Sequence, residues 1–200
     1  MAFRTQVPKA GPLAAHLVPH ARPLLRIALQ LVLGVAFLAA LAQVRVQVGP
    51  VPITGQTLGV LLIGAGYGAT MGVATMLSYL VAGGLGLAVF TGGGAGWEVL
   101  SGPSGGYLLG FPLAAALVGA LAARGWDRRP ATTAAAMVLG NLVIYASGLA
   151  WLARFAPDLP TTLSWGLWPF LPGDVVKIVL AAGLLPAAWG VLGLRRNRRR

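Results

Sequence analysis

The sequence predicts an all-α integral membrane protein with six transmembrane helices, and three observations support this fold class. Apolar residues make up 57% of the chain and charged residues only 10%, whereas an ordinary soluble domain carries about 25% charged residues. Mean hydropathy is +0.79. The basic residues gather near the ends of apolar segments. A chain with so little polar surface is predicted to fold in a lipid bilayer.

Six apolar segments account for the predicted helices. A helix needs about 20 apolar residues to cross the hydrocarbon core, with a range of about 17 to 25. The second segment is short and contains glycine, so it is the least typical span. The membrane domain is predicted over residues 24–194, with basic tails at 1–23 and 195–200. The six helices are predicted at about 24–42, 56–66, 71–87, 106–123, 131–153 and 172–194.

The distribution of positive charge predicts the orientation. Six spans place both termini on the same side of the membrane, and loops on the cytoplasmic side are enriched in Lys and Arg. The loops on the opposite side contain only Arg45 and Arg154. Both termini are therefore predicted to be cytoplasmic. The basic residues on their side are Arg4, Lys9, Arg22, Arg26, Arg124, Arg128, Arg129 and five arginines within 195–200.

A cleaved signal peptide is the alternative for the first apolar segment. Ala40-Leu41-Ala42 before Gln43 resembles an A-x-A cleavage site. Cleavage there would leave five spans and place the new N-terminus across the membrane. The long apolar run and the extended leader before it favour a retained helix.

Composition also excludes several classes of function. The net charge of +11 would suit a nucleic-acid binder, but the basic clusters have the positions of cytoplasmic loops, so no nucleic-acid partner is predicted. The chain has no cysteine, and its two histidines are His16 and His20. No metal site, no cofactor and no histidine catalysis is therefore predicted.

Two charged residues open the last predicted helix, in Leu171-Pro172-Gly173-Asp174-Val175-Val176-Lys177. Asp174 suits the positive end of the helix dipole, and its i, i+3 spacing from Lys177 allows the two to pair. An ionisable group in the hydrocarbon costs about 2.5–3.5 kcal/mol on insertion scales, so such groups usually face a cavity or each other. The pair is either a structural ion pair or a contact for a polar ligand, and we favour the ligand.

Two irregular segments lie on the same predicted external side. The Gly-rich stretch 91–107 contains Gly92-Gly93-Gly94, and glycine lets a ligand approach the main chain. The turn 49–57 brings Thr54 and Gln56 to the start of the second helix. A flexible connector and an ordinary turn would have similar compositions. Because both segments and the Asp174–Lys177 pair fall at one end of the bundle, we predict a pocket that opens outward.

Small residues lie one turn apart on the first predicted helix. Ala36 and Ala40 form a small-xxx-small pair, which lets another helix approach closely in a membrane. Alanine is common in membrane helices, so the spacing alone favours generic packing over a docking surface.

Several of these motifs together resemble the BioY family, over about 24–194 and in the same order. BioY proteins are the biotin-specific substrate-binding subunits, or S components, of energy-coupling factor (ECF) transporters. The resemblance rests on Val51-Pro52-Ile53-Thr54, Gln56-Thr57-Leu58-Gly59, Gly92 to Gly94, Gly102-Pro103-Ser104-Gly105-Gly106-Tyr107 and Pro172-Gly173-Asp174-Val175-Val176-Lys177.

The resemblance implies the ECF S-component fold in a bacterial or archaeal cell membrane, with a biotin pocket near the external face. It also implies a transmembrane coupling protein and two ABC-type ATPases as partners, with Ala36 and Ala40 as the docking surface for the coupling protein. The family often has a polar residue where this chain has Gly94. The biotin-binding residues implied are Gln56, Phe90, Gly92, Gly93, Gly94, Tyr107, Asp174 and Lys177.

The chemistry of biotin agrees with this set. Asp174 can accept from the ureido N–H groups, and Lys177 can hold Asp174 and donate to either the ureido carbonyl or the carboxylate. Tyr107 and Phe90 offer apolar walls, and small-ligand sites usually combine such walls with few polar groups. Three alternatives stay open: an S component for another small vitamin, an intramembrane enzyme, and a structural membrane protein. The enzyme lacks a nucleophile–base set, and the structural protein would leave the pocket features unexplained.

Overall fold

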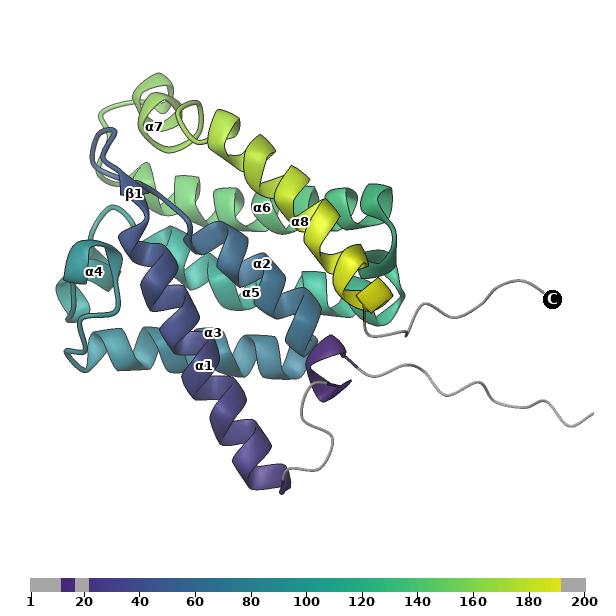
Figure 1. The fold of residues 1–200 in the computed structure, drawn as a ribbon. Coiled ribbons are helices and arrows are strands. Elements are labelled where there is room, and N and C mark those ends of the chain that lie inside the picture. The colour runs from purple at the N-terminus through teal and green to yellow at the C-terminus, as the bar shows by residue number, and fades with distance from the viewer. Residues whose placement is uncertain (1–11, 17–21, 192–200) are drawn as a thin grey trace, which may run out of the picture.

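The computed structural model describes residues 12–16 and 22–191, and this part of the chain forms a helical bundle (Figure 1). Eight α-helices occur within these residues, with three short 3-10 helices and one small antiparallel hairpin. In chain order they are η1 Leu13–His16, α1 Pro23–Gln43, β1 Arg45–Val46, β2 Ile53–Thr54, α2 Gln56–Tyr67, α3 Ala69–Gly84, η2 Thr91–Gly93, α4 Trp97–Ser101, α5 Gly105–Ala123, η3 Trp126–Arg128, α6 Pro130–Leu152, α7 Leu159–Gly166 and α8 Leu171–Val191.

The six helices predicted from the sequence correspond to α1, α2, α3, α5, α6 and α8, so the all-α membrane class is confirmed. Within the described residues, α1, α5, α6 and α8 are long and apolar enough to cross a membrane. Helices α2 and α3 have 12 and 16 residues. At 1.5 Å per residue they rise only about 18 and 24 Å, less than the ~30 Å hydrocarbon core. Residues 1–11, 17–21 and 192–200 lie outside the described part of the chain. Most of the two predicted tails, and the predicted end of the last helix at 192–194, fall on these residues.

Besides the three short 3-10 helices, the sequence analysis missed the β1–β2 hairpin, α4 and α7. The hairpin has two residues in each strand, with Arg45 opposite Thr54 and Val46 opposite Ile53. Helices α4 and α7 have five and eight residues. All three lie in connections that were expected to be irregular, so they shape the ends of the bundle without adding a span.

Helix α5 is the centre of the bundle and packs against α2, α3 and α6. In the most apolar 18 residues of α5, 61% of the positions are buried, whereas the corresponding share for α1 is 11%. Small residues allow the close contacts. A side chain at Gly64 of α2 would lie 2.9 Å from the Ala115 backbone, and one at Gly106 would lie 2.6 Å from the Ser147 carbonyl oxygen of α6. The spacing of these helices therefore requires glycine at the crossing points.

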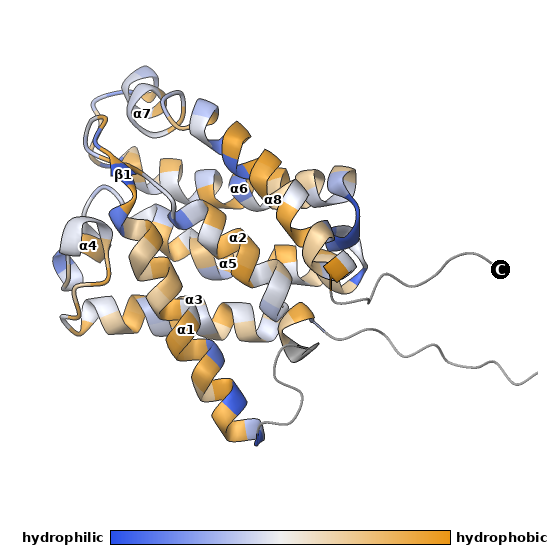
Figure 2. Ribbon diagram, viewed as in Figure 1, coloured by the Kyte–Doolittle hydropathy of each residue, from blue (hydrophilic) through white to orange (hydrophobic). Residues whose placement is uncertain are grey.

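Helix α1 packs on α2 and α3 along one side only. Gly34, Leu38 and Ala42 are buried on that side, and a side chain at Gly34 would lie 3.3 Å from the Tyr67 ring. The N-terminal half of α1 projects from the bundle in Figure 1, and Figure 2 shows α1 and α8 largely in hydrophobic colours. Ala36 and Ala40 are both exposed. The outward face of α1 is therefore apolar, and both of these alanines are exposed on the described part of the chain.

At the end of α8, a buried carboxylate joins this helix to η3. Asp127 is 3% exposed, and the Trp189 indole N–H donates to its Oδ2 at 2.6 Å. The Arg128 guanidinium lies 4.6 Å from the centre of the Trp189 ring. Burial raises the pKa of Asp127, and this effect outweighs the Trp189 hydrogen bond and the nearby Arg128 charge, which both lower it.

The substitution Asp127→Asn tests this buried carboxyl. The folded protein holds the Asp127 proton more tightly than the unfolded chain, so this group adds stability as the pH falls toward the ordinary Asp pKa of about 3.9. We expect the wild type to gain stability relative to Asp127→Asn as the pH is lowered from about 7 to about 3.5. Thermal unfolding of the detergent-solubilised proteins measures the difference.

Asp158→Asn is the matched control, because it should show the opposite sign. Asp158 caps α7 by accepting from the Thr161 backbone N–H at 2.8 Å. Hydrogen bonding to the Thr161 side chain, and then to its backbone, lowers the pKa of Asp158. Its stabilising contribution is present above the ordinary Asp pKa and is lost at the acidic end of the range. Identical pH profiles for wild type and Asp127→Asn would contradict the raised pKa of Asp127.

Candidate ligand-binding site

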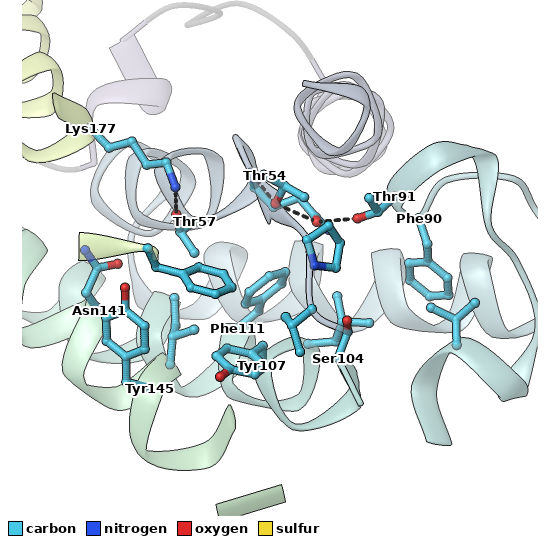
Figure 3. Close-up of a pocket in the computed structure, with 17 residues that line it drawn as sticks. Thr54, Thr57, Phe90, Thr91, Ser104, Tyr107, Phe111, Asn141, Tyr145 and Lys177 are labelled. Atoms are coloured by element: carbon cyan, nitrogen blue, oxygen red, sulfur yellow. Dashed lines mark hydrogen bonds between the residues drawn. The ribbon is translucent and has the colours of Figure 1, made fainter. Parts of the chain in front are cut away.

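A cavity lies at the end of the bundle where α8 begins, between the 51–57 segment, η2, α5 and α6. Figure 3 shows Lys177, Asn141 and Tyr145 on one side of it and Thr54, Thr91 and Phe90 on the other. Tyr107, Phe111 and Ser104 lie between these two groups. The lining residues are Val51, Pro52, Thr54, Gln56, Thr57, Phe90, Thr91, Val99, Ser104, Tyr107, Leu108, Phe111, Asn141, Ile144, Tyr145, Phe170 and Lys177.

The charged side of the cavity is organised by Asp174 in the first turn of α8. Lys177 Nζ donates to Asp174 Oδ1 at 3.0 Å and to Thr57 Oγ1 at 2.9 Å. The Tyr145 hydroxyl donates to Asp174 Oδ2. Asp174 is 5% exposed and does not line the cavity, whereas Lys177 does. Both carboxylate oxygens thus accept from protein donors, and Asp174 orients two side chains that reach the cavity.

The opposite side of the cavity is tied together by Gln56 at the start of α2. Its Oε1 accepts from the Thr54 hydroxyl at 2.9 Å and from the Thr91 hydroxyl at 3.0 Å. Its Nε2 donates to the Tyr79 hydroxyl at 2.8 Å, and Tyr79 in turn donates to the Val89 carbonyl oxygen. One buried amide therefore joins the hairpin, η2 and α3. Through Thr91 and Val89 it also holds the 85–96 connection, which contributes Phe90 and Thr91 to the cavity wall.

Aromatic side chains form the apolar walls. The Tyr107 and Phe170 rings are nearly parallel, with centroids 6.0 Å apart, and the Tyr145 ring meets Phe170 edge-on at 6.4 Å. The Tyr107 hydroxyl donates to the Gly166 carbonyl oxygen at 2.9 Å. Phe90 is 1% exposed and contacts Tyr79 edge-on at 5.3 Å. Contacts with several helices therefore hold these rings in the walls of the cavity.

The Gly92-Gly93-Gly94 run does not line the cavity. Gly92 and Gly93 have φ angles of +69° and +74°, which residues with a side chain rarely adopt. The Phe90 backbone N–H donates to the Gly94 carbonyl oxygen, and the Gly93 N–H donates to the Phe90 carbonyl oxygen. A side chain at Gly92 would collide with the Arg45 guanidinium. The run therefore forms a tight turn that holds Phe90 and Thr91 in the cavity wall.

Of the eight predicted ligand residues, the structure places Gln56, Phe90, Tyr107 and Lys177 in the lining, Asp174 behind Lys177, and the three glycines in the adjoining turn. Sequence reasoning missed Thr57, Asn141 and Tyr145. A signal for two of them was present, because Asn141 and Tyr145 are polar residues spaced i, i+4 in an apolar segment and so share a helix face. Thr57 belongs to the motif Gln56-Thr57-Leu58-Gly59, but no role was predicted for its side chain.

A membrane bundle with a mainly apolar cavity and a few fixed polar groups defines a small-molecule-binding membrane protein. Residues 14–193 match the BioY family, and the chain belongs to that family. This confirms the family predicted from the sequence motifs.

The relatives of this chain include archaeal and bacterial proteins. It is 38% identical over 149 residues to the probable biotin transporter BioY of Pyrococcus horikoshii, covering 74% of this chain and 87% of the relative. It is 37% identical over 141 residues to the biotin transporter BioY of Thermotoga maritima, covering 70% and 82%.

A solved structure has the same fold. It is the S-component for biotin from an ECF-type ABC transporter, with a TM-score of 0.70 and 25% sequence identity, covering 82% of this chain and 90% of that chain. The predicted ECF S-component fold is thereby confirmed.

Proposed function

We propose that this chain is the biotin-binding S component of an ECF-type transporter in a bacterial or archaeal cell membrane. Its family and the biotin transporters among its relatives support the substrate class. The observation that carries the proposal is the paired Lys177 and Asp174 at one side of a cavity with aromatic walls. An inert membrane bundle has no need to hold two ionisable side chains there.

The role of Lys177 follows from its unused donor. A lysine ammonium has three N–H donors, and two of them point to Asp174 and Thr57. The third is available to a carbonyl or carboxylate oxygen of biotin. Because Asp174 does not line the cavity and accepts from Lys177 and Tyr145, its role in this proposal is to position these two side chains. Tyr107 and Phe90 supply apolar walls, and Gly92 to Gly94 act through the turn that they form.

The proposed membrane arrangement uses α1, α2, α3, α5, α6 and α8 as six spans over residues 24–194. Helix α8 begins at the cavity and ends at η3, where Trp189 meets Asp127. The basic residues Arg124, Arg128 and Arg129 belong to that second end, whereas Arg45 lies in the hairpin beside the cavity. This charge distribution supports a cavity facing outward, both termini in the cytoplasm, and the segments 1–23 and 195–200 as cytoplasmic tails.

The proposed partners are a transmembrane coupling protein and two ABC-type ATPases. Helix α1 offers the docking face, because it is the least buried of the four long apolar helices. Ala36 and Ala40 are exposed on it, and close helix approach in membranes depends on small residues. The docking face and the cavity use different residues, so binding and coupling are separable in this proposal.

Biotin binding to the detergent-solubilised protein is the direct test, with Asp174→Asn as the diagnostic variant. The substitution removes the charge that holds Lys177 and weakens the acceptor for Tyr145. We expect it to weaken biotin binding about tenfold to a hundredfold by calorimetry, with Asp158→Asn as a control of unchanged affinity. Absence of biotin binding by the wild type would reject the proposed substrate. Unchanged affinity in Asp174→Asn would reject its positioning role.

Reporter fusions test the orientation. A reporter after Arg200 and another within the loop 124–130 should both read as cytoplasmic, because the basic clusters adjoin them. A reporter in the β1–β2 hairpin should read as external. An external signal from either of the first two fusions would contradict the six-span arrangement.

The double substitution Ala36→Trp with Ala40→Trp tests the docking face. Two indoles one turn apart would block close approach of another helix. We expect biotin affinity of the isolated chain to stay near wild type, while co-purification with the coupling protein and biotin uptake both fall at least tenfold.

The matched control is Val175→Trp with Val179→Trp, which places the same pair on the exposed face of α8 and should leave assembly intact. Normal assembly of the α1 variant, or its loss of biotin binding, would show that Ala36 and Ala40 serve another purpose.

A further inference from the structure

A second cavity lies at the far end of α8 from the ligand cavity. It has a volume of about 480 Å³ and is bounded by the α2–α3 turn, the last turn of α5, η3 and Trp189 of α8. Figure 2 shows the hydrophilic connection between α5 and α6 beside this end of α8. Small-molecule sites typically occupy about 300–1,000 Å³. Half of the lining residues are alanine or glycine, so the few polar atoms determine what the second cavity can bind.

Two of these polar atoms, on adjacent residues of η3, have no hydrogen-bond partner. Asp127 Oδ1 and Arg128 Nε are both buried and unpaired within the described residues, and both side chains line the second cavity. Asp127 is 3% exposed, and only its other oxygen accepts, from the Trp189 indole N–H. Native proteins seldom leave buried polar atoms unpaired. A ligand that donates to Asp127 and accepts from Arg128 would satisfy both atoms.

The charge of Asp127 favours a cationic donor. Among the described residues, the only ion pair joins Lys177 to Asp174. The Arg128 guanidinium lies over the Trp189 ring, 4.6 Å from its centre, and forms no ion pair with Asp127. Buried charges are usually paired, and burial raises the pKa of Asp127. A cation at Oδ1 would offset this cost of burial, whereas a neutral hydroxyl would leave the charge uncompensated.

The arginine side favours a phosphate. A guanidinium matches the geometry of phosphate oxygens and is weakly hydrated. Arg124 and Arg129 are exposed in the same connection and add positive charge nearby. Basic pockets between membrane helices on the cytoplasmic side are known to bind phospholipid headgroups. A phosphate and a primary ammonium joined by two carbons, as in phosphoethanolamine, would meet the two adjacent residues Asp127 and Arg128 together.

The position of the second cavity favours a lipid as the source of this group. It lies at the ends of two long apolar helices, α5 and α8. Leu184 and Val191 are exposed on α8 on either side of Trp189 along the chain. The glycerol and acyl chains of a phospholipid can therefore lie against apolar surface while the headgroup enters the cavity. In the proposed membrane arrangement, this is the cytoplasmic leaflet.

We infer that the second cavity binds a phosphatidylethanolamine headgroup, with the ammonium donating to Asp127 Oδ1 and the phosphate accepting from Arg128 Nε. This inference goes beyond the proposed function and does not depend on which molecule the first cavity binds.

Native mass spectrometry of the detergent-solubilised protein tests the inference with three lipids that have identical acyl chains. Phosphatidylethanolamine has the ammonium donor, phosphatidylcholine keeps the charge without an N–H, and phosphatidylglycerol lacks the cation. Wild type should bind phosphatidylethanolamine about tenfold to a hundredfold more tightly than the other two, as expected for a hydrogen bond to a charged group. Asp127→Asn should lose most of this preference. Arg128→Gln should weaken all three lipids, because each contains the phosphate.

Matched controls lie at the other end of the bundle. Arg154 also stacks on a tryptophan, 4.5 Å from the Trp151 ring centre, and Asp158 is a helix-capping carboxylate. Arg154→Gln and Asp158→Asn should keep the wild-type affinities and selectivity. Ala120→Trp provides a variant outside η3, because Ala120 lines the second cavity and is exposed. Its indole should occupy the space and weaken all three lipids, even if the η3 variants fail to fold.

Four results would overturn the inference. The first is equal affinity of wild type for phosphatidylethanolamine and phosphatidylcholine, and the second is wild-type selectivity in Asp127→Asn. The third is displacement of the lipid by an equal concentration of soluble phosphoethanolamine, because the headgroup alone would then be the ligand. The fourth is unchanged lipid binding by Ala120→Trp together with loss of the coupling protein in co-purification, because the second cavity would then receive a protein partner.

Discussion

Along α5, glycine and alanine residues face three other helices, and this close packing is the constraint on which the rest of the structure depends. In lipid, helices gain little from hydrophobic association, so contact between small residues and van der Waals packing must hold them together. A side chain at Gly119 would collide with the Ala69 backbone of α3, and one at Gly110 with Ser147 of α6. Because α5 packs so closely on α2 and α6, it sets the distance between the cavity residues that these helices carry.

The charged residues of the cavity are tolerable because their charges cancel locally. Each isolated charge in the hydrocarbon costs about 2.5–3.5 kcal/mol on insertion scales, and a buried pair repays this only when its remaining donors and acceptors are also satisfied. Here Asp174 accepts from Lys177 and Tyr145, and Lys177 also donates to Thr57. Most donors and acceptors of this group are therefore paired within the protein. Few polar atoms remain to bind a ligand, which favours selective recognition of a small polar group.

Much of the fold was predictable, because apolar length and basic flanks are strong signals in a membrane protein. The six main helices were located within a few residues. The hairpin, α4 and α7 were not, since such short elements depend on tertiary contacts such as the Trp151 indole N–H donating to the Gly102 carbonyl oxygen. At the site, the i, i+3 spacing of Asp174 and Lys177 predicted their pairing. It could not indicate which of the two faces the cavity, because that depends on Tyr145, 29 residues earlier in the chain.

Helix α8 has polar contacts at both of its ends, to Tyr145 of α6 at one and to Asp127 of η3 at the other. Its 21 residues extend about 32 Å, and the exposed side between these ends carries Val175, Val179 and Leu184. The opposite side packs against α6 and α2, with Ala181 and Leu185 buried, so the helix is held along one side as well as at both ends. Lys177 at the cavity and Trp189 beside η3 belong to this one helix, so α8 connects the ligand site directly to the connection between α5 and α6.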